Sequence, residues 1–72
     1  MTNPALDERG DLERKLHVLD AELEKLRKRL YWLRTTLGPN QEDHPDIQSV
    51  LRRYNETAEE FTKVYRQWNQ QA

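Results

Sequence analysis

Four side chains of the kind that bind metal ions lie along one flank of a predicted helix. Glu13, His17, Asp20 and Glu24 follow one another at spacings of four, three and four residues, which brings them to one side of a helix. Carboxylate oxygens and imidazole nitrogens can ligate a divalent ion. The group holds one histidine and lacks the Glu-x-x-His unit of carboxylate-bridged centres. We therefore interpret it as a solvated surface and expect neither a metal nor a cofactor.

A cluster of cations is the second candidate for chemistry. If the chain folds back on itself near residue 40, Arg52 and Arg53 are expected beside Leu30 and Tyr31, within reach of Tyr54. Cations bind phosphates and aromatic rings stack on bases, so nucleic-acid binding is the alternative function. Acidic residues near the same end and a net charge of -1 weigh against it. The candidate contacts are Arg27, Lys28, Arg29, Arg34, Arg52 and Arg53.

The residue types that carry catalysis are scarce. The chain has no cysteine and no glycine-rich phosphate loop, and its single serine, Ser49, falls inside a predicted helix. Two helices alone form no concave pocket. We therefore expect that the protein is not an enzyme and that it has no catalytic residues.

The elements that position these residues are two helices. Leucine recurs from Leu12 to Leu37 at alternating spacings of four and three, the a/d heptad pattern of a helix that buries one stripe. This predicts a first helix over about 11–37, with Asp11 as its N-cap. An earlier start at Asn3-Pro4 is the alternative, but Gly10 weakens continuity there, so residues 1–10 are expected to be a flexible or frayed segment. Gly38 and Pro39 end the helix.

The second helix is predicted over about 45–69, after a polar turn at 38–44. Pro45 suits the first helical position, and Asp46 favours the positive N-terminal end of the helix dipole. Apolar residues then repeat at heptad spacing from Ile47 to Trp68. Two helices of similar length joined by a short turn predict an all-α antiparallel hairpin, with residues 1–72 forming a single domain.

The apolar stripes exceed what two helices can cover for each other. Only 35% of residues are hydrophobic and 35% are charged, too few apolar residues for an enclosed core. A second copy would cover the stripes and form a homodimeric four-helix bundle. Residues 11–24 carry five acids and two bases, and residues 25–37 carry five bases and no acid, so antiparallel copies would be complementary. The expected self-association or partner interface is Leu16, Leu19, Leu23, Leu26, Leu30, Leu33, Leu51, Tyr54, Phe61, Tyr65 and Trp68.

Trp32 and Tyr31 lie off the leucine stripe, on opposite flanks of the first helix. They are either rings that lie over a neighbouring helix of the bundle or a second contact with a partner. The resulting hypothesis is a non-enzymatic interaction module that acts as an adaptor, chaperone or regulator of a larger protein. No apolar run is long enough to span a bilayer, and the first residues do not resemble a signal peptide, so we expect a cytoplasmic location without membrane contact.

Overall fold

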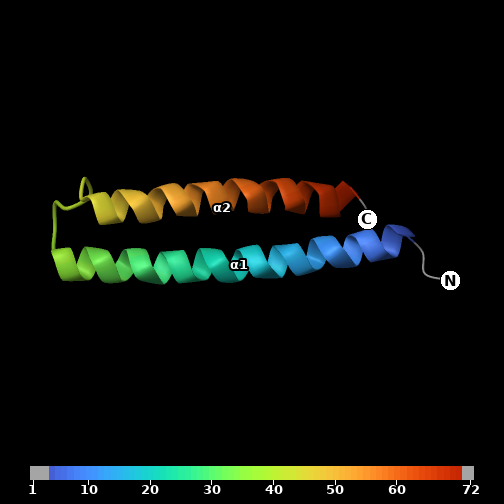
Figure 1. Ribbon diagram of the computed structural model, residues 1–72, viewed down its shortest axis with the longest axis horizontal. Coiled ribbons are helices and arrows are strands. Elements are labelled where there is room, and N and C mark those ends of the chain that lie inside the picture. The colour runs from blue at the N-terminus through green and yellow to red at the C-terminus, as the bar shows by residue number, and fades with distance from the viewer. Residues whose placement is uncertain (1–3, 71–72) are drawn as a thin grey trace.

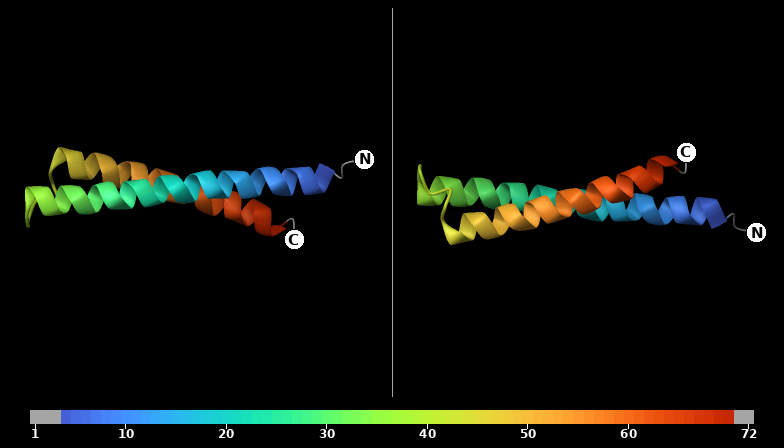
Figure 2. Two further views of the ribbon diagram at one scale, coloured as in Figure 1. Left: turned by 90° about the horizontal axis from the view of Figure 1, so that it is seen from below. Right: turned by 90° about the horizontal axis from the view of Figure 1, so that it is seen from above.

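The protein is a rod made of two antiparallel helices, α1 (Pro4–Leu37) and α2 (Pro45–Gln70), in a computed structural model (Figure 1). The structure describes the backbone of residues 4–70 and the side chains of residues 8–70. The rod measures 56 × 15 × 15 Å. The helices cross at a shallow angle, as the two side views show (Figure 2). This confirms the predicted all-α hairpin.

The first helix begins seven residues before the predicted start. Pro4 opens α1, and the helix runs through Gly10 without a break. The expectation that residues 1–10 form a frayed segment is therefore wrong for residues 4–10, and residues 1–3 lie outside the described part. Proline fits the first helical turn, and a single glycine costs only about 1 kcal/mol in a helix interior. Asp11 is consequently not an N-cap; its carboxylate pairs with Arg14 one turn later.

The turn between the helices is held by specific hydrogen bonds. Gly38 adopts a left-handed φ of 86°, and its N–H donates to the Arg34 carbonyl over 3.1 Å, which ends α1 as predicted. Asn40 is also left-handed, with φ of 67°. The Arg34 guanidinium donates to both Glu42 carboxylate oxygens over 2.8 and 3.0 Å. The end of α1 is thereby tied to the loop.

The second helix begins at Pro45, as predicted, and ends one residue beyond the expected position. His44 caps it. The His44 carbonyl accepts from the Gln48 N–H over 3.0 Å, and its Nδ1 accepts from the Asp46 N–H over 3.1 Å. The imidazole thus satisfies a donor that would otherwise be free at the helix start.

The core is a single narrow seam between the helices. Among the described side chains, the buried apolar ones are Leu26, Ile47, Val50 and Val64, and Thr57 is buried with them. Ile47 alone is fully enclosed. Seven of the eight leucines from Leu12 to Leu37 remain partly exposed, with Leu26 as the exception. The two helices therefore share too little contact to enclose their own apolar stripes.

Candidate protein-interaction surfaces

Aromatic side chains gather along one side of α2. The Phe61 and Tyr65 rings stack with centroids 6.4 Å apart, and the Tyr65 and Trp68 rings lie 5.8 Å apart. Tyr65 is 47% exposed, and Tyr54, Phe61 and Trp68 are half-buried. Leu51 and Ala58 complete this side at heptad spacing from Tyr65. We call these six α2 residues the aromatic face.

Charged residues of α1 border the aromatic face. The Trp68 indole N–H donates to Glu13 over 3.1 Å, and the Arg9 guanidinium lies 4.7 Å from the centre of the Trp68 ring. Farther along, the neighbouring Tyr54 hydroxyl raises the pKa of Arg27. Glu13 and Arg27 belong to a heptad row on α1 that also includes Asp20 and Arg34. That row is acidic at one end and basic at the other.

The outer edge of the aromatic face has no charge. Seven residues of α2 recur along this edge at alternating spacings of three and four, and none is charged at neutral pH: Gln48, Leu51, Asn55, Ala58, Thr62, Tyr65 and Asn69. The eight charged residues of α2 all occupy other positions. Exposed helix surfaces in a highly charged chain normally carry charge, whereas the centres of interfaces are depleted of it. The arrangement is therefore typical of a contact surface.

Comparison of the chain with known protein families, with curated proteins and with solved structures finds no match.

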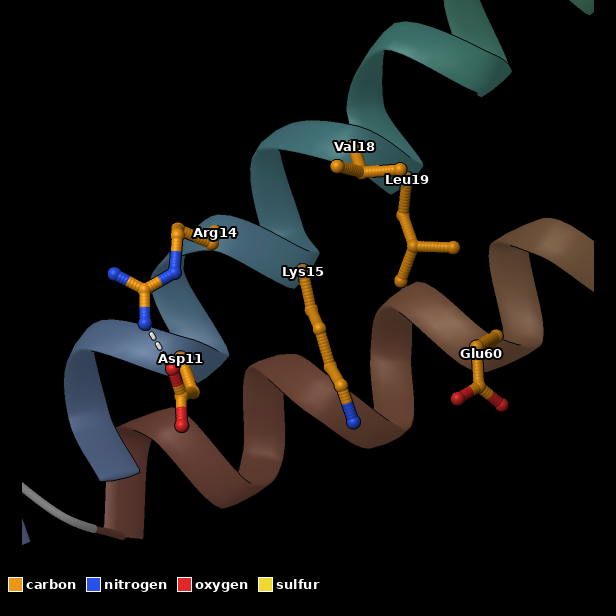
Figure 3. A pocket seen from close by; sticks show the side chains of 6 residues that line it. All are labelled: Asp11, Arg14, Lys15, Val18, Leu19 and Glu60. Atoms are coloured by element: carbon orange, nitrogen blue, oxygen red, sulfur yellow. Dashed lines mark hydrogen bonds and ion pairs between the residues drawn. The ribbon is translucent and has the colours of Figure 1, made fainter. Parts of the chain in front are cut away.

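A second candidate surface lies on the opposite flank of α1. Val18 is 68% exposed and Trp32 is 67% exposed, and each borders a shallow hollow. The hollow at Val18 lies between the helices (Figure 3): Leu19 points from α1 toward α2, Lys15 extends across, and Glu60 projects from α2. The hollow at Trp32 is lined by Leu33, Lys28 and Arg29.

Most of the predicted interface residues are half-buried. Leu26 is buried, Tyr65 is exposed, and the other nine are half-buried. Half-burial is the state expected of a stripe covered on one side only. Trp32 and Tyr31 are both exposed, so within one chain neither ring lies over the other helix.

The predicted basic cluster is only partly assembled. All six of its cations are exposed, but Arg27 pairs with Glu24, Arg34 with Glu42, and Arg53 with Glu22 at 3.8 Å. The expectation that Arg53 lies beside Tyr31 is wrong, because its side chain extends toward Glu22, away from the turn. Three of the six cations are therefore paired with carboxylates of the same chain.

Other kinds of site find no support among residues 8–70. No group of three or more histidine, aspartate or glutamate side chains there is arranged to hold a metal ion. Neither helix has a stretch of sufficient length and hydropathy to cross a bilayer within the part of the chain that the structure describes.

Sequence reasoning missed the contacts that fasten the ends of the hairpin. Arg9 and Glu13 hold Trp68 at the open end, and Glu42 and His44 organise the turn. Arg9 and Glu13 are four residues apart in the sequence, and their charged groups lie 3.9 Å apart in the structure. This spacing favours a helix that continues through Gly10.

Proposed function

We propose that this protein is a non-enzymatic interaction module, a helical hairpin that self-associates in the cytoplasm and serves a larger partner as an adaptor, chaperone or regulator. The observation that supports it most directly is the aromatic face with its uncharged edge. Large aromatic side chains left half-exposed in a row are characteristic of binding surfaces rather than of monomer surfaces.

A second copy of the hairpin is the occupant that the charges favour. When two copies meet face to face with their α1 helices antiparallel, the acidic end of the Glu13–Arg34 row lies over the basic end of the other copy. Asp20 then faces Arg27 of the second copy. Each exposed pair contributes at most about 1 kcal/mol, so the charges select the orientation while the aromatic face supplies the free energy of association.

Light scattering combined with thermal unfolding tests the proposal. At micromolar concentration the protein is expected to show about twice the chain mass. Tyr65→Glu places a charge in the centre of the aromatic face, and we expect it to shift the mass toward one chain and to lower the midpoint of unfolding. The matched control is Tyr31→Glu, since Tyr31 is 73% exposed and lies off that face.

The control variant is expected to keep the dimeric mass. A single-chain mass for the unmodified protein, combined with a cooperative unfolding transition, would show that the hairpin is stable alone and would refute self-association.

A further inference from the structure

A six-residue pattern occurs twice in α1. Residues 14–19 read Arg-Lys-Leu-His-Val-Leu, and residues 28–33 read Lys-Arg-Leu-Tyr-Trp-Leu. Each copy has two cations, a leucine, an aromatic or imidazole ring, an exposed apolar residue and a second leucine. The copies lie 14 residues apart, so in a heptad helix they occupy equivalent positions on the same side.

The two copies of the pattern form similar hollows. The first has a volume of about 500 Å³ and includes Arg14, Lys15, Val18 and Leu19. The second has a volume of about 460 Å³ and consists of the corresponding Lys28, Arg29, Trp32 and Leu33. Val18 and Trp32 are almost equally exposed, at 68% and 67%. We call these eight residues the Trp32 strip.

The Trp32 strip faces away from the aromatic face. Glu60 of α2 borders the hollow at Val18, whereas Ala58 belongs to the aromatic face. Two residues along a helix differ by about 200° around its axis, so Glu60 and Ala58 lie on opposite flanks of α2. A second copy bound at the aromatic face would therefore leave the Trp32 strip uncovered.

The charge of the strip is positive, most strongly at Trp32. Its cations are Arg14, Lys15, Lys28 and Arg29, with Lys25 between the two hollows. Asp11 and Glu60 offset this charge at the Val18 hollow, where Asp11 pairs with Arg14. Among residues 8–70, no acidic residue lines the Trp32 hollow, and residues 25–37 contain no acid at all.

We propose that the Trp32 strip binds an amphipathic helix of another protein, with apolar residues two heptads apart and carboxylates beside the one that covers Trp32. The inference rests on the proposed interaction function but not on self-association. The apolar residues would occupy the two hollows, and the carboxylates would pair with Lys28 and Arg29.

A helix fits the strip better than an extended peptide. The hollows are about 21 Å apart, and a helix presents side chains two heptads apart on one face at that same separation. Within the hollows, the half-buried Leu19 and Leu33 extend the apolar contact beside Val18 and Trp32. An extended segment alternates its side chains between two faces and would leave this stripe partly uncovered.

A designed helical peptide provides the probe. It carries leucine two heptads apart, glutamates beside one of these leucines, and a fluorescent label for anisotropy titration with the full-length protein. We expect Trp32→Ala to weaken binding at least about tenfold, and Lys28→Glu with Arg29→Glu to weaken it by a similar factor. The matched control is Lys63→Glu with Arg66→Glu, which makes the same charge change on the outer side of α2 and is expected to alter affinity less than about twofold.

Several results would overturn the inference. One is a loss of affinity in the α2 control as large as that in the strip variants. Another is equal affinity for a peptide with lysine in place of glutamate. A third is no binding by a peptide that circular dichroism shows to be helical. Competition by anionic vesicles or duplex RNA that depends on Trp32 would assign the strip to those ligands instead. A fall to single-chain mass in Trp32→Ala would assign it to a second copy.

The two proposals fail independently. Peptide binding by a protein of single-chain mass would refute self-association and support the proposal for the Trp32 strip. A dimer that does not bind the peptide would support self-association and refute the proposal for the Trp32 strip.

Discussion

Among the side chains of residues 8–70, Thr57 is the one polar group buried in the narrow core. Its hydroxyl donates to the Arg53 carbonyl over 2.8 Å, in the same helix. That carbonyl is also the acceptor for the Thr57 backbone N–H in a regular helix, so the hydroxyl bond is an addition to a group already satisfied. The side chain lies in the buried row between Val50 and Val64. Burial removes the hydroxyl from water, and the hydrogen bond that it makes in the helix contributes little to the free energy of folding.

Replacing that hydroxyl with a methyl group is therefore expected to stabilise the protein. Thr57→Val should raise the free energy of unfolding by about 0.5–1 kcal/mol, measured by urea denaturation, because valine keeps the branched shape and removes the buried polar atom. Thr35 makes the same kind of bond to the Tyr31 carbonyl but is exposed, so Thr35→Val should change stability by less than about 0.5 kcal/mol. A loss of stability in Thr57→Val alone would mean that the hydroxyl is needed in the core.

At the scale of elements, the turn directs α2 back along α1. Two residues with left-handed backbone, Gly38 and Asn40, reverse the chain, and the Arg34–Glu42 pair fixes the loop against the end of α1. Gln48 adds a further tie, since its side-chain amide donates to the Glu42 carbonyl over 2.6 Å. The direction in which α2 leaves the turn is therefore set by local contacts as well as by the apolar seam.

The two glycines of the chain are expected to respond to alanine with opposite signs. Gly38→Ala forces a side chain into left-handed geometry and should lower the free energy of unfolding by about 1 kcal/mol. Gly10→Ala should raise it by about 0.5–1 kcal/mol, because Gly10 lies inside α1 and the nearest atom to its new methyl group is Arg14 Nη1 at 3.9 Å. Chemical denaturation of both variants measures these changes in the free energy of unfolding. An unchanged free energy of unfolding in Gly10→Ala would imply that helix 4–10 is not formed in solution.

The whole molecule is a long rod with a small interior. A 56 × 15 × 15 Å shape has a high ratio of surface to volume, and the seam between two helices buries few apolar side chains. A chain of this length is at the lower limit of independent stability even when it is globular. Self-association at the aromatic face would relieve this shortage and make thermal stability depend on protein concentration.

The architecture was predictable because the heptad period and the turn residues agree on it. The leucine spacing of residues 12–37 predicts the first helix, and Gly38 and Pro45 predict the reversal and the start of the second. Three of the four helix ends lie within one residue of their predicted positions. The start of the first helix differs because a single glycine, Gly10, weakens a helix without ending it, and the helix continues back to Pro4. Long-range side-chain contacts, such as Glu13 with Trp68, depend on how the helices cross, and heptad counting does not contain that information.

The position of Trp68 at the open end of the hairpin has a consequence for how the molecule comes apart. Contacts beside the turn close short loops, whereas Trp68 meets Glu13 across 55 residues of chain, so contacts there form at a greater entropic cost. Amide hydrogen exchange should therefore be slowest near Leu26 and Val50 and progressively faster toward residues 8–13 and 66–70. Trp68→Ala should accelerate exchange in these last two segments while leaving the amides near Val50 almost unchanged. Uniform acceleration along both helices would mean instead that the hairpin opens as a single cooperative unit.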